Sequence, residues 1–305
     1  MEGLLLSINS AVAQGVLWGI MTLGVYITYK ILDYADLTVD GSFALGGAVS
    51  AILIMMGWDP LLSLLIAFLS GLVAGVVTGV LHTKLKIPAI LSGILSMIAL
   101  YSINLSIMGG KANIALLGME TVFTKAQALL PAGFDKAMVS LSIGVVFSLA
   151  IMGILYWFFG TEIGALIRAT GNNENMARAM GGNTDRMKIL GLLLSNGLVA
   201  LSGALVAQSQ GYADVGMGTG TIVMGLAAVI IGEVLFGTRI NYFFRMTSVV
   251  TGSVIYRIII AIILRMGLKS SNLKLFTAII VAMALSIPEI KAKFIKPKIN
   301  LEKAE

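Results

Sequence analysis

The sequence has no cysteine, a single histidine and few charged residues. Without cysteine there is no disulfide framework, no thiolate chemistry and no cysteine-based metal site, and the lone His82 argues against a histidine-rich one. Only 12% of the 305 residues are charged and 58% are hydrophobic, whereas a soluble domain is about 25% charged. This composition excludes an ordinary soluble protein. The apolar runs are continuous, which argues against a β-barrel, whose strands alternate apolar and polar residues.

The apolar runs predict an all-α, polytopic transmembrane helical bundle. A helix needs roughly 20 apolar residues to cross about 30 Å of hydrocarbon, and nine segments approach this length. These segments are Leu4–Tyr29, Ser42–Trp58, Pro60–Leu81, Pro88–Ile107, Ala137–Phe159, Ile189–Gln208, Thr219–Gly237, Met246–Arg265 and Leu273–Ile287. Gly71, Gly75 and Gly79 form a ridge of small residues that permits close helix contact, and we expect it to pack inside one subunit in preference to a dimer seam.

Basic residues orient the predicted spans, because Lys and Arg favour cytoplasmic loops. If the N-terminus lies outside, most of these residues fall on inner loops, including Lys84 and Lys86, Arg178 and Lys188. We therefore expect an outside N-terminus and an inside C-terminus. The net charge of +6 then reflects cytoplasmic loops and not nucleic-acid binding.

An internal repeat relates the two halves of the chain. The segment 34–36 (Tyr-Ala-Asp) recurs at 212–214, and each copy follows an apolar span and precedes a short, glycine-rich one. Five spans separate the copies, so the halves run in opposite directions, and short segments at matching places mark broken helices around a transport path. We predict one membrane domain over 1–305, with halves of about 1–159 and 186–290, an inner loop 160–188 and a basic tail 289–305.

The inner loop 160–188 predicts one short helix with well-defined ends. We expect Gly171 to break the preceding helix and Asn173 to act as N-cap. Glu174 then sits in the first turn and can pair with Arg178 at i+4, while Gly181 supplies a left-handed C-cap.

The same short helix carries a small apolar face. Met176, Ala177 and Met180 form this face, which suits a groove on a partner protein. The alternative is a helix that lies on lipid headgroups.

This loop resembles the cytoplasmic coupling loop of ABC importer permeases of the branched-chain amino acid and ribose type. The residues that match the pattern are Gly164, Arg168, Ala169, Thr170, Gly171, Asn173, Ala177, Arg178 and Gly181. The segments 19–28, 36–43 and 218–232 are also similar to that family, so the resemblance covers nearly the whole chain.

The resemblance implies a permease subunit with the type II importer fold, multi-pass in the cytoplasmic membrane of a prokaryote. It implies a second permease copy as homodimer partner, cytoplasmic ABC ATPase subunits docked on the loop, and an extracytoplasmic binding protein or lipoprotein. The coupling residues would be Arg168, Gly171, Asn173, Glu174, Met176, Ala177, Arg178, Met180 and Gly181.

One departure from the family pattern concerns the solute. Branched-chain amino acid permeases carry an Asn-Phe-Ala-His-Gly-like segment in the broken helix, whereas residues 36–42 read Asp-Leu-Thr-Val-Asp-Gly-Ser. This variant is similar to a subgroup accompanied by binding lipoproteins for aromatic amino acids or unassigned small solutes. The variant therefore favours an amino acid as the transported solute.

Polar and glycine residues near the breaks are candidates for the translocation path, since ionisable groups in a membrane are costly and usually functional. The candidates are Asp36, Asp40, Gly41, Ser42, Asp214, Gly218, Gly220 and Glu233. Asp36 and Asp214 can equally be N-caps of the helices that follow. For Glu233, and for Arg257 inside a span, a structural pair or a snorkelling side chain is the alternative.

The sequence also lacks the motifs of several enzymes. It has no G-x-x-x-x-G-K-[ST] phosphate loop, no H-E-x-x-H and no G-x-S-x-G. We therefore predict no catalytic, cofactor or metal site, and expect ATP chemistry to come from another polypeptide. An ion-coupled secondary transporter with inverted repeats remains the alternative function, and a membrane enzyme is a third.

Overall fold

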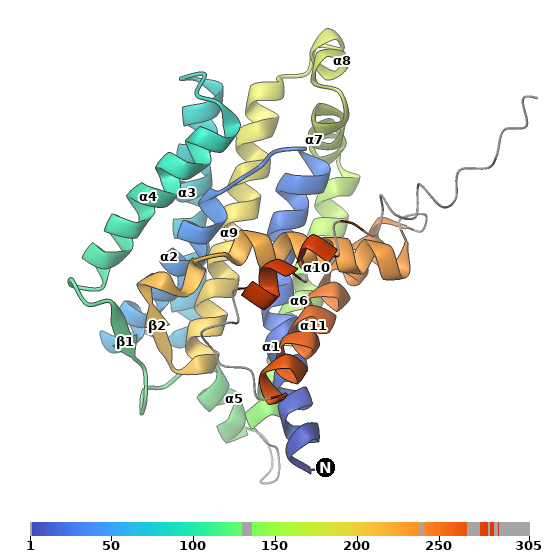
Figure 1. Cartoon of the computed structure of the whole chain (residues 1–305). Coiled ribbons are helices and arrows are strands. Elements are labelled where there is room, and N and C mark those ends of the chain that lie inside the picture. Colours follow the sequence, from blue (N-terminus) through green and yellow to red (C-terminus); the bar gives the residue numbers. More distant parts are fainter. Residues whose placement is uncertain are drawn as a thin grey trace, which may run out of the picture.

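The computed structural model describes residues 2–129, 136–237, 241–266, 275–279, 281–283 and 286. Helices dominate this part of the chain (Figure 1). In order, the elements are α1 (Glu2–Tyr26), the π-helical turn η1 (Ile27–Ile31), α2 (Thr38–Met55), α3 (Pro60–Thr83), α4 (Ala89–Ile107), β1 (Asn113–Ala115), α5 (Val122–Leu129), α6 (Lys136–Gly160), α7 (Glu162–Asn172), α8 (Glu174–Ala179), α9 (Thr184–Gln210), β2 (Tyr212–Asp214), the 3₁₀ turn η2 (Val215–Gly218), α10 (Thr221–Phe236) and α11 (Tyr242–Arg265).

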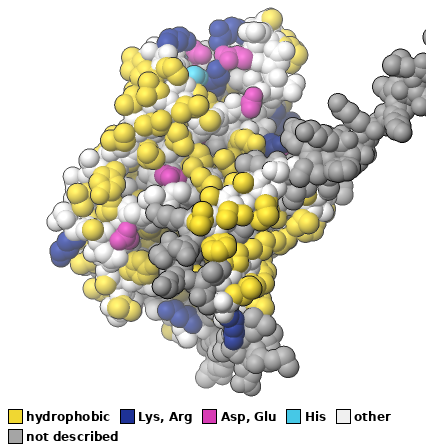
Figure 2. Space-filling model, in the orientation of Figure 1, with side chains coloured by type: hydrophobic (Ala, Val, Ile, Leu, Met, Phe, Trp, Pro, Cys, Tyr) yellow, Lys and Arg dark blue, Asp and Glu magenta, His cyan; other side chains and the backbone are white. Residues whose placement is uncertain are grey.

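Eight helices of the described chain are long and apolar enough to cross a membrane. They correspond to the first eight predicted spans, so the polytopic all-α bundle is confirmed. The ninth predicted span, Leu273–Ile287, is described only in part, at residues 275–279, 281–283 and 286, and the basic tail 289–305 lies entirely outside the described residues. Exposed apolar side chains spread over the outer surface (Figure 2), as expected where lipid is the solvent.

Helix α9 lies at the centre of the bundle and packs against α1, α2 and α3. Burial inside the chain reaches 89% in the first span and 72% in α2 and α9, but only 28–39% in the other five. The first span, α2 and α9 therefore form the core, while the remaining spans keep a face for lipid or for another subunit.

The first span and α9 run in opposite directions, as the inverted repeat predicts. The hydroxyl of Ser195 donates to the carbonyl of Gly24, and that of Ser202 donates to the carbonyl of Leu17, each at 2.8 Å. Later residues of α9 thus meet earlier residues of α1. Figure 1 shows α1 rising from the N-terminus while α9 descends from α8.

Both predicted helix breaks are present. The first comprises residues 32–37, between η1 and α2. Helix α2 begins at Thr38, four residues before the predicted start at Ser42, because Oδ1 of Asp36 accepts a hydrogen bond from the Thr38 amide at 2.9 Å and satisfies a free donor of the first turn. The second break contains β2 and η2, ahead of α10.

A small antiparallel sheet at the second break was not predicted. Strand β2 pairs with β1, placing Asn113 opposite Asp214 and Ala115 opposite Tyr212. Strands of three residues are too short to show the alternation by which a strand is recognised in sequence.

Glycines allow α9 to approach its neighbours closely. The α3 ridge packs against α9, since Cβ atoms at Gly71 and Gly75 would overlap the carbonyl oxygens of Asn196 and Leu192. The predicted packing of this ridge inside one subunit is confirmed. At the crossing of α2 and α9, a Cβ at Gly203 would likewise overlap the carbonyl oxygen of Phe43.

Replacing Gly203 by Val should therefore push α2 away from α9 and destabilise the bundle by about 1–3 kcal/mol or more. The matched control is Gly153→Val on α6, where nothing lies within 4 Å of an added Cβ. Thermal unfolding in detergent should show a lower midpoint for Gly203→Val only. Equal midpoints for the two variants would contradict the close crossing.

Candidate functional site

Helices α7 and α8 form a hairpin at the end of the bundle where α9 begins (Figure 1). Asn173 ends α7 in extended backbone, with φ of −158° and ψ of 99°, and its Oδ1 accepts a hydrogen bond from the Met176 amide at 3.0 Å. Gly181 follows α8 with φ of 85°, in the left-handed region that glycine tolerates. The predicted caps of the short helix, Asn173 and Gly181, are confirmed.

The prediction that Gly171 breaks the preceding helix is wrong, because α7 continues to Asn172. A Cβ at Gly171 would overlap the carbonyl oxygen of Ile31. The absence of a side chain lets α7 pack directly on η1, at the end of the first span. Gly171 therefore serves contact between the hairpin and the core.

Glu174 joins α8 to the first turns of α9. Its Oε1 accepts a hydrogen bond from Arg178 Nη2 at 2.9 Å and from the Thr184 hydroxyl at 3.3 Å, and its Oε2 accepts one from Lys188 Nζ at 2.7 Å. The Glu174–Arg178 pair was predicted. The bond from Lys188 is the main reason that the pKa of Glu174 lies below its ordinary value, so this carboxylate is ionised at neutral pH.

The apolar side chains of α8 divide between an outer and an inner face. Met176 is 44% and Met180 79% exposed, whereas Ala177 is 1% exposed. The predicted common face of these three residues is therefore wrong for Ala177, which packs inward. The two methionines are four residues apart and form an exposed apolar pair.

Arg168 lies on α7, away from this methionine pair. It lines a pocket of about 530 Å³ together with Tyr26, Lys30, Tyr242 and Arg245. The pocket sits at the junction of the first span, α7 and α11. Arg168 is thus placed between the hairpin and the membrane core.

Asp40 belongs to α2 but caps α10. Its Oδ2 accepts a hydrogen bond from the Gly220 amide at 2.8 Å, and its Oδ1 accepts bonds from the Thr221 hydroxyl and the Ile222 amide, both at 2.9 Å. A carboxylate here satisfies free amides of the first turn and interacts favourably with the helix dipole. The two broken helices are joined in this way across 180 residues of sequence.

Asp36 and Ser42 are held by Asn196 of α9. The Asn196 amide Nδ2 donates to Oδ2 of Asp36 at 2.7 Å, and its Oδ1 accepts from the Ser42 hydroxyl at 2.6 Å. All three side chains are buried, where an unpaired polar group would be costly. The N-terminal turn of α2 is therefore tied to the central helix.

The remaining candidates at the second break shape its backbone. A Cβ at Gly218 would overlap the carbonyl oxygen of Asp40, and Gly220 has φ of 84° at the N-cap of α10. Asp214 caps η2, since its Oδ1 accepts a hydrogen bond from the Gly216 amide at 2.7 Å. The capping alternative is thus confirmed for Asp214. It is wrong for Asp36, because Leu37 occupies the N-cap position of α2 and the Asp36 carboxylate, one residue earlier, accepts the hydrogen bond from the Thr38 amide.

A pocket of about 390 Å³ opens beside the two breaks. Asp40 and Gly41 line it, together with Tyr101, Asn104 and Thr219. Ser42 faces α9 instead. Of the predicted path residues, the structure thus brings Asp40 and Gly41 to an open space and buries Asp36 and Ser42.

The other two ionisable candidates have partners. Glu233 Oε2 lies 2.9 Å from Lys30 Nζ, which links α10 to the end of the first span. The Arg257 guanidinium stacks on the Trp18 ring, 3.9 Å from its centroid. The structural-pair alternative therefore holds for Glu233.

Sequence reasoning missed Lys188, Thr184 and Asn196, the partners that fix the candidates in place. Lys188 lies 14 residues from Glu174 and Asn196 lies 160 from Asp36, so no local pattern connects them. A polar asparagine within an apolar span was the one available signal, because such residues are costly in lipid unless bonded. Across the described residues, no group of three or more His, Asp or Glu side chains could hold a metal ion.

Comparison with known proteins places this arrangement in a family. Residues 7–287 match the family described as "Branched-chain amino acid transport system / permease component". A tyrosine transport system permease protein of Clostridioides difficile is 41% identical over 97% of this chain and 98% of its own. An uncharacterized protein of Rickettsia prowazekii is 35% identical, covering 91% and 96% of the two chains.

A more distant relative is the ribose import permease protein of Escherichia coli, 26% identical over 65% of this chain and 57% of its own. The resemblance stated from the coupling-loop residues is confirmed by these matches. The chain belongs to the branched-chain amino acid permease family, and it is a multi-pass, membrane-spanning permease of an ABC importer for a small solute.

Proposed function

We propose that this permease imports an amino acid with an aromatic side chain, driven by ATP hydrolysis in a separate cytoplasmic subunit. The solute class rests on the tyrosine permease relative, which matches nearly the full length of both chains, and on the Asp36–Ser42 variant of the broken helix. Two copies of the chain enclose the path, and an extracytoplasmic binding protein delivers the solute.

The ATPase docks on α8 through the exposed methionine pair, Met176 and Met180. Methionine side chains are flexible and polarisable and adapt well to a partner groove. The six residues of α8 have little helical stability alone, because isolated helices shorter than about 12–15 residues are marginal in water. The Asn173 cap and the Glu174 contacts therefore supply the rigidity that docking needs.

The observation that carries the proposal is the pair of contacts between the hairpin and the core. Lys188 fixes α8 to α9 through Glu174, and Gly171 seats α7 on η1 of the first span. Movement imposed on α8 would thus reach the two most central spans directly. The subunits would then shift between outward-open and inward-open states, each favoured by differential binding free energy.

The translocation path runs past the pocket beside the two breaks. Irregular backbone at membrane depth must be buried in protein or line a cavity, and Asp40, Gly41 and Thr219 border such a cavity. Asp36, Ser42, Asp214, Gly218, Gly220 and Glu233 act in this proposal by holding the breaks and the ends of α2 and α10 in place.

Docking is tested by changing Met176 and Met180 together to Asp. The double variant keeps the α8 backbone but charges its outer face, so we expect loss of ATPase co-purification and of uptake. The matched control is Leu117→Asp with Met119→Asp, two exposed apolar residues in the loop at the opposite end of the bundle. If the α8 variant retains the ATPase as the control does, the helix lies on lipid and the docking proposal fails.

The transmission of movement from α8 to α9 is tested separately by the variant Lys188→Met. This change removes the bond to Glu174 and leaves the docking face intact, so the ATPase should still co-purify while ATP-dependent uptake falls roughly tenfold, a typical coupling effect. Lys86→Met is the control, since its exposed ammonium lies 3.7 Å from Asp185 and does not touch α8. Equal uptake by both variants would contradict the proposal that the contact between Lys188 and Glu174 transmits movement from α8 to α9.

The path is tested with single cysteines, which are unique labels because the chain has none. Cysteine at the exposed, pocket-lining Thr219 should react rapidly with a membrane-impermeant maleimide, and its rate should change when nucleotide binds the ATPase. Cysteine at the buried Ser42 is the matched control and should stay inert. An unreactive Thr219→Cys in every nucleotide state would place this pocket against lipid.

A further inference from the structure

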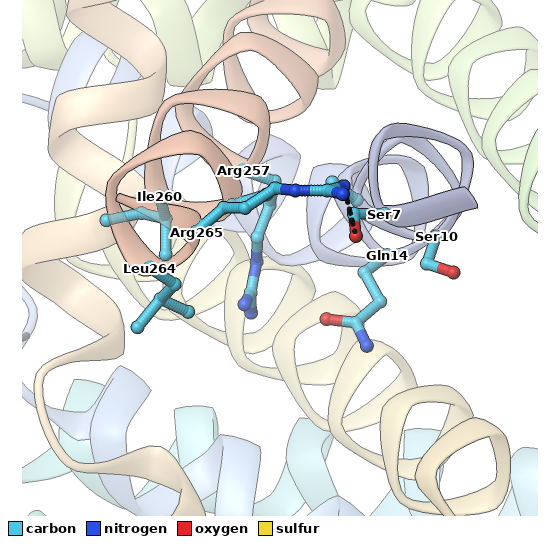
Figure 3. Close-up of a pocket in the computed structure, with 9 residues that line it drawn as sticks. Ser7, Ser10, Gln14, Arg257, Ile260, Leu264 and Arg265 are labelled. Atoms are coloured by element: carbon cyan, nitrogen blue, oxygen red, sulfur yellow. Dashed lines mark hydrogen bonds between the residues drawn. The ribbon is translucent and has the colours of Figure 1, made fainter. Parts of the chain in front are cut away.

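A polar pocket of about 640 Å³ lies between α1 and α11, at the end of the bundle opposite α8. Its polar side is formed by Ser10 and Gln14 of α1 and by Arg257 and Arg265 of α11. Figure 3 shows Arg257 and Gln14 reaching into the space between the two helices. The described lining holds two cations and no acidic residue, so the pocket is electropositive.

Arg257 carries a positive charge well inside the span α11. It lies eight residues before the end of α11 at Arg265, which is about 12 Å along the helix. A cationic side chain at such a depth is costly in hydrocarbon unless it pairs with an opposite charge or lines a polar cavity.

Within the described residues, Arg257 has no anionic partner. Among the side chains that the structure describes, no carboxylate lies within 4.0 Å of Arg257 or Arg265, and Arg265 donates a hydrogen bond to the Ser7 hydroxyl at 3.4 Å. One face of the Arg257 guanidinium is covered by Trp18, 3.9 Å away. This stacking leaves the N–H edges, which are the groups that bind planar oxyanions.

The pocket also has an apolar wall. Ile260, Ala261 and Leu264 of α11 and Ala11 of α1 line it beside the polar groups. A ligand that fills both parts must carry an anionic oxygen group on an apolar body.

We propose that the pocket between α1 and α11 binds an amphipathic anion, whose carboxylate or phosphate oxygens are held by Arg257 and Arg265 while its apolar part lies along α11. Two sources have this chemistry. One is an anionic phospholipid of the surrounding membrane. The other is the carboxylate of the transported amino acid, and this source alone rests on the proposed function.

The test uses the purified chain in nanodiscs and two defined probes. The lipid probe is phosphatidylglycerol mixed into phosphatidylcholine, with the phosphatidylglycerol retained per chain measured by native mass spectrometry. The amino acid probe is radiolabelled L-tyrosine, measured by equilibrium binding in phosphatidylcholine alone. Tyramine, which has the same ring and no carboxylate, serves as the competitor that should fail.

At least one probe should bind the parent chain and bind Arg257→Met roughly tenfold more weakly, since a charge-assisted oxyanion contact is lost. Arg265→Met should weaken the same probe in the same direction. Arg257→Lys keeps the positive charge and should retain part of the binding, which separates loss of charge from loss of folding. The matched control is Lys111→Met, which removes an exposed cation outside the pocket and should bind like the parent.

Loss of phosphatidylglycerol in the arginine variants identifies the lipid source. Loss of L-tyrosine binding in the arginine variants identifies the transported solute as the source, provided that tyramine does not displace L-tyrosine from the parent chain. If neither probe binds the parent, or if both arginine variants bind as the parent does, the inference is overturned. ATPase docking does not enter these measurements, so a failed docking proposal would leave their result unchanged.

Discussion

The Asp40 carboxylate is the contact on which the arrangement of the two broken helices depends. In a bilayer every backbone amide must find its partner inside the protein, and the first turn of α10 presents free amides at membrane depth. Asp40 accepts hydrogen bonds from two of them and from the Thr221 hydroxyl. Without this carboxylate, the Gly220 and Ile222 amides would lose their hydrogen-bond acceptor, and α10 would lose this link to α2.

The other polar groups of the core extend this contact toward α8. Asn196 holds Asp36 and Ser42, which fixes the first turn of α2 to α9. Eight residues earlier on α9, Lys188 binds Glu174 of α8. Bonded side chains together with α8, α9 and the first turn of α2 therefore form a continuous route from the exposed methionine pair to the break before α10. Rigid elements joined in this way can carry coupling between distant sites.

The two ends of the bundle differ in how their candidate functional residues are paired. The end with α7 and α8 combines cationic and anionic side chains in tight pairs around Glu174, which suits a fixed docking surface. At the other end, the arginines between α1 and α11 have no paired carboxylate among the described residues. Glu174 is therefore neutralised within the protein, whereas Arg257 and Arg265 are the groups that the proposed anion would bind.

The sequence by itself determined the membrane class, eight described spans, both helix breaks, the opposed halves and the caps of α8, because each depends on local composition or spacing. Runs of apolar residues, Asn173 before a helix and Gly181 after it act through neighbours a few residues away. The tertiary structure alone decided which partners the polar residues find. Asp40 bonds α10 across 180 residues, Gly171 meets Ile31 instead of ending a helix, and Ala177 turns inward while the methionines stay outside. These outcomes depend on which helices lie side by side, and a linear pattern of residues does not encode that directly.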